Sequence, residues 1–159
     1  MTAVVTEHEP RSDSLTARDP AWDYRDRFTV NTTAGQYDTV DQVVSDWFTQ
    51  QPFWIRLLST NTVSLAAVTR VDASGGYRVG SAIGSWRVVH RDEHEIVFGD
   101  SLGFIKYWYS LALPSDAPNT VEGSTAIRYL WRRTGGFYFA LVRPWHQLFV
   151  KLALAKTVS

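Results

Sequence analysis

Cysteine is absent from this sequence of 159 residues, which excludes disulfide bonds, a thiolate nucleophile and a cysteine-ligated zinc site. Long apolar runs are also missing, since no uncharged apolar stretch reaches the roughly 18 residues that a membrane-spanning helix needs. Residues 1–20 lack the basic and apolar regions of a signal peptide. We therefore expect a cytoplasmic protein.

Neither sign of charge is in excess. The chain has 16 basic and 16 acidic residues and no basic stripe that would follow a phosphate backbone, so nucleic acid is not expected as a partner. With no spanning segment, a membrane is not expected either. Aromatic residues are abundant instead, and include seven tryptophans and seven tyrosines. They could build a core of large residues or line a pocket for a hydrophobic small molecule.

The length suits one domain with its own core. Residues 1–22 are polar and aperiodic, so we expect a flexible N-terminal arm there, and residues 23–159 are expected to form a single ligand-binding domain. A first strand is predicted over residues 23–32. Thr39 and Gln42 have the spacing of a capping box at the start of an amphipathic helix.

The rest of the chain predicts a second short helix, an antiparallel meander and a long closing helix. Pro52 suits the first position of the short helix, over residues 52–59. The closing helix, over residues 135–156, is expected to open at a pair of glycines and to bend near Pro144. The meander strands are predicted over residues 83–92, 94–102, 104–114 and 119–134.

Alternation of side chains places aromatic residues on one face of the predicted meander. Tyr107 and Tyr109 share that face with Tyr129 and Trp131, whereas Trp108 points the other way. A buried hydroxyl without a partner costs roughly 1–3 kcal/mol, so a dry core would more simply use leucine, isoleucine or valine. The pattern therefore favours a pocket on this face.

The closing helix is apolar on two sides, so more than one surface should cover it. One stripe could face the sheet, while the other could line a cavity or meet a second copy of the chain in a homodimer. The first stripe consists of Phe137, Leu141, Trp145, Leu148 and Leu152, and the second of Tyr138, Val142, Phe149 and Ala153.

The order of these elements resembles the helix-grip fold of the START-like (SRPBCC) superfamily, an α+β fold in which a curved antiparallel sheet wraps around a long C-terminal helix. The stretches "DYRDRF", "DEHEIVFGD" and "GGFYFALVRPWHQLFVKLAL" are similar to a bacterial family of domains of unknown function within it, over residues 23–156. The resemblance implies a cavity between sheet and helix that holds a hydrophobic small molecule, but it supplies no catalytic residues, because superfamily members include carriers, cyclases and hydrolases. The residues that carry it most specifically are Gly136, Tyr138, Val142, Pro144 and His146.

The stretch "HRDEH", from His90 to His94, has the spacing of some zinc peptidases, but that motif works only on a helix. Strand-like segments flank it here, so we expect a hairpin that turns at Asp92 and Glu93 and places His90 opposite Glu95. A Gly-x-Ser-x-Gly elbow and a phosphate-binding loop are both missing from the sequence. We therefore expect no metal and no cofactor.

Three polar residues have two interpretations each. His90 could be a general base or a strand-end partner of Glu95. Asp100 could be a base or the ion-pair partner of Arg143. His146 could be a catalyst or a hydrogen-bond partner that fixes the closing helix.

Together these features favour a cofactor-independent cyclase of a hydrophobic, polyketide-like natural product, which encloses and preorganises its substrate and could act by cycloaddition. The alternatives are a non-catalytic carrier or sensor of such a molecule and an acid/base cyclase. The candidate catalytic residues are Tyr107, Tyr109, His90 and Asp100. The candidate ligand-binding residues are Trp54, Trp86, Tyr129, Trp131, Tyr138, Leu141 and Trp145.

Overall fold

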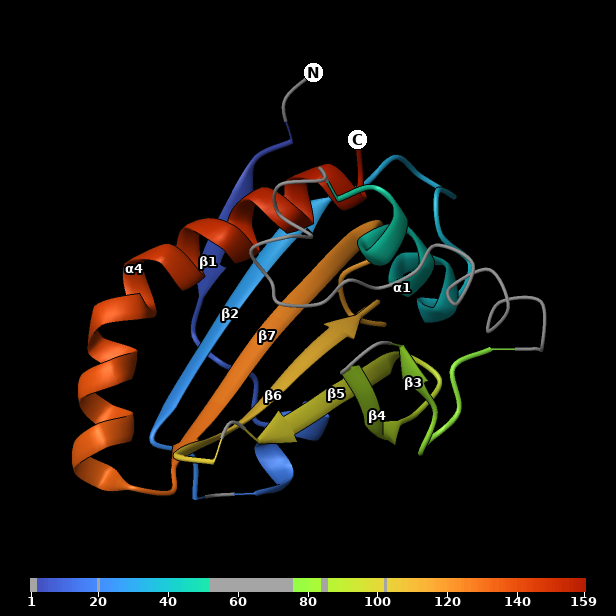
Figure 1. Cartoon of the computed structure of the whole chain (residues 1–159). Helices are drawn as coiled ribbons and strands as arrows, with labels where there is room; N and C mark the ends of the chain where they lie inside the picture. Colours follow the sequence, from blue (N-terminus) through green and yellow to red (C-terminus); the bar gives the residue numbers. More distant parts are fainter. Residues whose placement is uncertain (1–2, 20, 52–75, 84–85, 102) are drawn as a thin grey trace.

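A computed structural model describes residues 3–19, 21–51, 76–83, 86–101 and 103–159 of the chain. Within these ranges the chain forms a seven-stranded antiparallel sheet in the order β1-β2-β7-β6-β5-β4-β3 (Figure 1). The strands from β4 to β7 are neighbours in chain order, which confirms the predicted meander. The strands are β1 (Val5–His8), β2 (Tyr24–Asn31), β3 (Ala82–Ile83), β4 (Trp86–Arg91), β5 (Glu95–Ser101), β6 (Ile105–Ala112) and β7 (Thr120–Tyr129).

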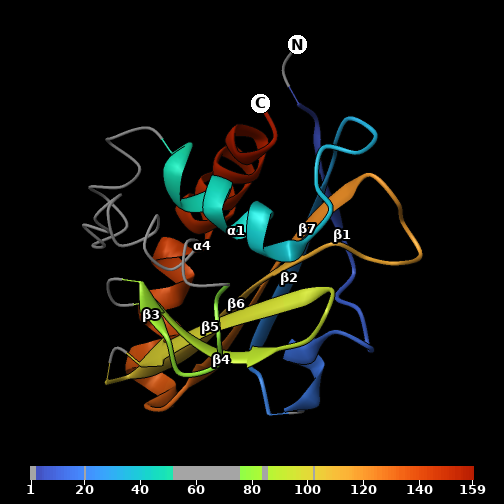
Figure 2. The same cartoon turned by 90° about the vertical axis from the view of Figure 1, so that its right-hand side faces the viewer.

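In the described part of the chain, the helices α1 (Val40–Thr49) and α4 (Arg132–Thr157) pack on the same face of the sheet, which we call the inner face (Figures 1 and 2). The predicted capped helix is confirmed as α1, where the Gln42 side chain accepts a hydrogen bond from the N–H of Thr39 at 3.2 Å. The predicted short helix over residues 52–59 lies outside the described residues. No helix in the described part is both long enough and apolar enough to cross a membrane.

The predicted alternation of the meander is confirmed at four of its aromatic residues. Tyr107, Tyr109 and Tyr129 belong to the inner-face clusters, while Trp108 packs with Ala126 on the opposite, outer face. Side chains alternate between the two faces along each strand, and residues paired across neighbouring strands point to the same face. Odd-numbered residues of both β6 and β7 therefore face inward.

Trp131 does not share that face, so its prediction was wrong. β7 ends at Tyr129, after which the N–H groups of Leu130 and Trp131 both donate to the carbonyl of Phe104, at 2.9 and 3.3 Å. These bonds turn the chain out of the sheet and into α4, of which Trp131 is the N-terminal cap residue. Its side chain is 65% exposed.

The closing helix is confirmed, but it begins at Arg132 rather than at the glycine pair. Gly135 lies in the first turn, where its role is close packing: a β-carbon there would lie 2.8 Å from the carbonyl oxygen of Phe104. Figure 1 shows that α4 bends in its middle. Pro144 lies inside the helix there, and it lacks the N–H that would continue the hydrogen-bond ladder.

The hairpin between β4 and β5 is confirmed, so "HRDEH" does not lie on a helix. Its turn is one residue later than predicted, because the N–H of Asp92 donates to the carbonyl of Glu95 at 2.9 Å and Arg91 pairs with Ile96. The Asp92 side chain also accepts from the N–H groups of His94 and Glu95, which stabilises this later turn.

The expected pairing of His90 with Glu95 was also wrong. His90 lies opposite Val97, and an irregularity in the pairing between Val88 and His90 inserts one extra residue, Val89, into β4. Such a bulge puts two successive side chains on one side of the strand. The His90 ring consequently lies on the outer face, 4.8 Å from the Trp108 ring.

The N-terminal arm extends and covers the sheet. β1 pairs with β2 as an edge strand, an element that the sequence did not predict. A short 3-10 helix, η1 (Leu15–Arg18), then packs on the outer face, where Leu15 is 2% exposed and contacts the cluster of Trp108. The Trp22 ring lies 4.8 Å from the Trp108 ring. The outer aromatic residue is therefore covered by the arm.

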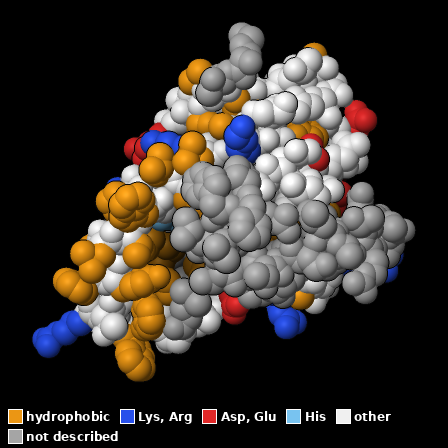
Figure 3. Space-filling view, turned by 45° about the horizontal axis from the view of Figure 1, so that its top comes forward, with side chains coloured by type: hydrophobic (Ala, Val, Ile, Leu, Met, Phe, Trp, Pro, Cys, Tyr) orange, Lys and Arg blue, Asp and Glu red, His pale blue; other side chains and the backbone are white. Residues whose placement is uncertain are grey.

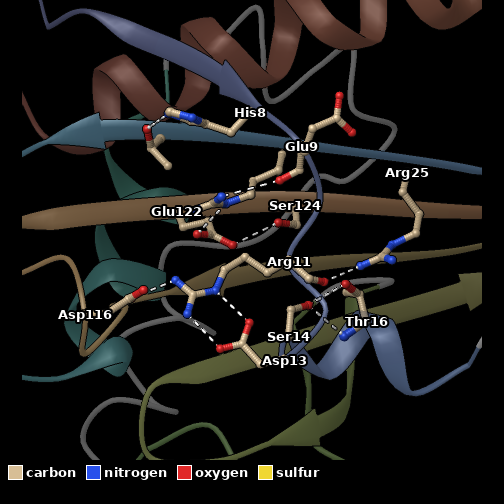
Figure 4. Close-up of polar contacts among 12 residues, drawn as sticks. His8, Glu9, Arg11, Asp13, Ser14, Thr16, Arg25, Asp116, Glu122 and Ser124 are labelled. Carbon is tan, nitrogen blue, oxygen red and sulfur yellow. Dashed lines mark hydrogen bonds and ion pairs between the residues drawn. The ribbon is translucent and has the colours of Figure 1, made fainter.

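Polar contacts hold this arm against the outer face (Figure 4). The Arg11 guanidinium donates to Asp116 at 2.7 Å, and the carbonyl of Arg11 accepts from Arg25 at 2.8 Å. Below the arm, Arg27 donates to the buried carboxylate of Glu122 at 2.8 Å. The first two bonds join the arm to β2 and to the loop that precedes β7, and the third joins β2 to β7.

Candidate functional site

A carboxylate lies on the otherwise apolar inner face of β2. Asp26 occupies the inward position between Tyr24 and Phe28, and it is 4% exposed. Its Oδ2 atom accepts a hydrogen bond from the Tyr24 hydroxyl at 2.7 Å. Its Oδ1 atom has no hydrogen-bond partner among the described residues. Because a buried carboxylate is costly unless it is paired, this free oxygen marks Asp26 as a candidate functional group.

His146 approaches Asp26 from α4. It follows Pro144 in the bend of the helix, and its Nε2 atom lies 3.4 Å from Asp26 Oδ2 and 3.1 Å from the hydroxyl of Thr125. Thr125 is the partner of Asp26 in the register of β2 and β7, which explains why both reach the same ring. Through these contacts His146 joins α4 to the sheet. Its side chain is 23% exposed, so solvent reaches the pair.

The hydroxyl of Tyr109 is buried without a hydrogen-bond partner in the described part of the chain. It lies over Gly123, where a β-carbon would approach it to 2.7 Å. Burial, and secondarily the negative charge of Asp26, raises the pKa of Tyr109 well above its ordinary value. The hydroxyl therefore keeps its proton and can donate a hydrogen bond. We call Tyr24, Asp26, Tyr109, Thr125 and His146 the Asp26–His146 site.

Aromatic rings surround one side of this site. Trp86 on β4 lies 5.8 Å from the Tyr109 ring and 6.4 Å from the Tyr107 ring. Beneath α1 the rings interlock, with Trp47 at 4.9 Å from Tyr109. Toward the first half of α4, Tyr24, Tyr107 and Tyr129 are only partly buried around Phe139. On the inner face, the rings that stay partly exposed therefore include those next to the first half of α4.

The structure brings together three of the candidate residues from the sequence, namely Trp86, Tyr107 and Tyr109. Tyr129 lies on the same face beside Phe139, at a ring distance of 6.3 Å. Burial, and secondarily the charge of Asp100, raises the pKa of Tyr107. Trp54 lies outside the described residues.

The other candidate residues lie away from the site. His90 is on the outer face, and Asp100 is exposed at the end of β5. Asp100 is not the partner of Arg143, which lies over the Tyr24 ring instead, at 5.0 Å. Tyr138 is 37% exposed and packs edge-on against Phe104.

Leu141 and Trp145 also lie away from the site, on the exposed side of α4. Their side chains are 62% and 73% exposed. The face of α4 that contacts the sheet carries other residues, namely Gly135, Phe139, Val150, Ala153, Leu154 and Thr157. Of the two stripes expected from the sequence, the second therefore flanks the buried face, and the first faces outward.

A family model described as a protein of unknown function (DUF2867) matches residues 20–153. The chain belongs to this family. No curated protein and no solved structure matches the chain. The DUF2867 region contains both Asp26 and His146 and every strand from β2 to β7, whereas β1 and η1 precede it.

Sequence reasoning missed Asp26, Tyr24 and Thr125. A signal for Asp26 was present, because a charged residue at an inward position of a strand is rare unless it is paired or functional. Applying the alternation test to residues 23–32 would have found it. No comparable signal identified Thr125, since its partner comes from a helix distant in sequence. Among the described residues, no group of three or more histidine, cysteine, aspartate or glutamate side chains could hold a metal ion.

The arrangement supports proton transfer next to an apolar surface. A carboxylate that contacts an imidazole orients the ring and stabilises the imidazolium formed when the ring takes up a proton. The protonated Tyr109 hydroxyl supplies a hydrogen-bond donor for an oxygen that gains negative charge.

Proposed function

We propose that this protein is a cyclase that binds a hydrophobic, polyketide-like small molecule on its inner face and closes a ring within it by acid/base catalysis. The observation that carries the proposal is the contact between the buried Asp26 and the partly exposed His146. Among the described residues, one oxygen of this carboxylate and the Tyr109 hydroxyl on the same face have no hydrogen-bond partner. Two unpartnered polar atoms on one apolar face are expected where a ligand supplies the missing partners.

The aromatic surroundings support a flat, apolar ligand. Tyr24 and Phe139 pack at a ring distance of 4.6 Å, and the Phe139 ring lies 5.9 Å from His146. Together with Tyr107 and Trp86, these rings present faces and edges next to the acid/base pair. The resemblance to START-like domains supports the same location, because the ligand of a helix-grip fold lies between the curved sheet and the long helix.

In the proposed reaction, His146 removes a proton from a carbon next to a ketone, and Asp26 stabilises the imidazolium. That carbon then attacks a second carbonyl of the same molecule and forms a carbon–carbon bond, while the π bond of this second carbonyl becomes an alkoxide. Tyr109 donates to the oxygen that carries the charge, and the proton held by His146 returns to the alkoxide. The product therefore has the mass of the substrate.

Holding both carbonyls in one pocket contributes to the rate as well, because it replaces an encounter by an intramolecular step. This is the enclosure mechanism expected from the sequence. The Asp26–His146 contact favours the acid/base form of the cyclase over enclosure alone, since a pericyclic closure would need no proton-transferring pair.

The test is turnover of a linear poly-β-ketone thioester by the purified protein, followed by chromatography coupled to mass spectrometry. We expect a product of unchanged mass and altered retention. Asp26→Asn and His146→Gln should each lower the rate by about 100-fold or more, which is the usual contribution of general acid/base catalysis. Asp100→Asn is the matched control, because this exposed carboxylate lies outside the site and should leave the rate unchanged.

Other outcomes would separate the alternatives. A ligand that binds but is recovered unchanged would identify a carrier or sensor and contradict catalysis. Turnover that survives Asp26→Asn and His146→Gln but is lost in Tyr107→Ala would show that enclosure alone closes the ring. Melting temperatures close to that of the wild type would confirm that each variant is folded.

A further inference from the structure

A ridge of large apolar side chains runs along the outward side of α4. It consists of Phe137, Leu141, Trp145, Leu148 and Leu152, which are 71%, 62%, 73%, 49% and 40% exposed. Their spacings of three and four residues keep them on one side of the helix, and they follow about 22 Å of helix path, at 1.5 Å per residue, across the bend at Pro144. Figure 3 shows hydrophobic side chains gathered over this part of the molecule. The ridge is unusual, because a monomeric protein rarely exposes so many large apolar residues together.

The charges of α4 are all of one sign. The helix contains five basic residues and no aspartate or glutamate, although the whole chain is neutral. Lys151 forms an ion pair with Glu7 at 3.2 Å. The other four form no ion pair among the described residues. These five basic residues are Arg132, Arg133, Arg143, Lys151 and Lys156.

We propose that the ridge docks onto the surface of an anionic lipid bilayer. A helix that presents tryptophan, phenylalanine and leucine on one side, with exposed basic residues such as Arg133 and Lys156 near its ends, has the composition of helices that lie in the plane of a membrane interface. Basic side chains next to the surface add electrostatic attraction to anionic headgroups. The opposite side of α4 is packed on the sheet, so the ridge can meet the bilayer without α4 leaving the fold.

Charge favours an anionic bilayer over a second copy of the chain as the partner of the ridge. In a two-fold pairing through the ridge, α4 would lie against its own copy and bring like charges such as Arg133 and Lys156 together. The helix offers no acidic residue to compensate for them. An anionic bilayer offers an apolar interior to the ridge and negatively charged headgroups to the basic side chains. This inference revises the sequence-based expectation that no membrane takes part, and it is independent of the proposed reaction.

The test is co-sedimentation of the full chain with phosphatidylcholine vesicles and with vesicles of equal parts phosphatidylcholine and phosphatidylglycerol. We expect binding only to the anionic vesicles and weaker binding at high salt. The double variant Leu141→Gln, Trp145→Gln should bind at least roughly tenfold more weakly, since it removes two of the most exposed apolar side chains. Val79→Gln is the matched control, because Val79 is 61% exposed but lies outside α4, and it should bind as the wild type does.

A second variant keeps the ridge and tests the charge. Arg133→Gln with Lys156→Gln should weaken binding to anionic vesicles while the melting temperature stays unchanged. Three results would overturn the proposal. The first is no binding to anionic vesicles, and the second is equal binding by the wild type and the ridge variant. The third is a dimer in sedimentation velocity that the ridge variant dissociates, which would make the ridge an interface between copies.

Discussion

At the scale of single residues, two tyrosines of this protein have opposite environments. The Tyr109 hydroxyl is buried without a partner among the described residues. The Tyr37 hydroxyl, by contrast, has two acceptors within reach of its one proton, the carbonyl of Thr157 at 2.7 Å and the Asp46 carboxylate at 3.0 Å. An unpaired buried hydroxyl costs about 1–3 kcal/mol, while a paired one contributes about 1 kcal/mol. The same substitution should therefore have opposite effects at the two positions.

We expect Tyr109→Phe to leave the free energy of unfolding unchanged or to raise it by up to about 1 kcal/mol, and Tyr37→Phe to lower it by about 1–2 kcal/mol. Urea denaturation measures both values. If Tyr109 serves a ligand, its variant should also turn over the poly-β-ketone more slowly. A strong loss of stability in Tyr109→Phe would show that the hydroxyl has a structural partner.

Glu95 is a second residue whose environment opposes its charge. It is 7% exposed on the outer face, and burial raises its pKa, although the N–H of Leu15 donates to its Oε2 atom at 2.6 Å and opposes that shift. In the folded protein this carboxyl group therefore holds its proton to a higher pH than in the unfolded chain, where the pKa is about 4.3. As the pH rises from the pKa of Glu95 in the unfolded chain to its pKa in the folded protein, the free energy of unfolding therefore falls.

We expect Glu95→Gln to match the wild type in free energy of unfolding at about pH 4 and to exceed it at about pH 7, because the amide never ionises. The comparison is made by urea denaturation across this range. Glu93→Gln controls for the loss of one charge, since Glu93 is exposed in the turn. A constant difference between Glu95→Gln and the wild type at every pH would contradict the expectation.

At the scale of elements, the contact between α4 and the end of β7 depends on one of two adjacent glycines. A β-carbon at Gly135 would lie 2.8 Å from the backbone oxygen of Phe104, which cannot move aside easily. A β-carbon at Gly136 would lie 3.8 Å from the Tyr129 ring, an ordinary contact distance. Alanine favours a helix over glycine by about 1 kcal/mol at either position.

The two substitutions should therefore differ in sign. Gly135→Ala is expected to lower the free energy of unfolding by about 1–3 kcal/mol, because the overpacking exceeds the helix preference. Gly136→Ala should raise it by up to about 1 kcal/mol. Thermal and urea unfolding of both variants provide the comparison. Stabilisation by both would mean that α4 does not approach Phe104 and the end of β7 as closely as described.

At the scale of the whole molecule, the N-terminal arm contributes to the fold although most of it precedes the matched family region. Leu15 is buried against the outer face, whereas Val4 is 79% exposed. We expect Leu15→Ala to lower the free energy of unfolding by about 2–5 kcal/mol, as for other buried leucines. Val4→Ala should change it by less than about 0.5 kcal/mol. Equal and small effects would indicate that the arm does not pack on the sheet in solution.

Much of the architecture was predictable because it follows from short-range patterns. The alternation in residues 104–113 determined which rings of β6 face inward, and the spacing from Thr39 to Gln42 determined the start of α1. Predictions failed where a long-range contact overrides the local pattern. Trp131 continues the alternation of β7 in sequence, but the hydrogen bonds to Phe104 end the strand before it.

The candidate site was predictable only in part, for the same reason. Trp86, Tyr107 and Tyr109 follow from strand parity, and the structure places them together. The partners of His146 come from β2 and β7, and their approach depends on where the bend of α4 directs the ring. The pairing of His90 with Glu95 was predicted wrongly because the turn of the hairpin lies one residue later than the sequence suggested.

The sequence by itself determined the kinds of element, their order and the parity of most side chains, because propensity, capping and alternation act over a few residues. The tertiary structure alone decided which polar groups meet, which stripe of α4 faces outward and what covers Trp108. These outcomes depend on contacts between segments separated by a hundred residues or more in some cases, such as Asp26 with His146. Only packing of the complete chain brings such groups within hydrogen-bonding distance.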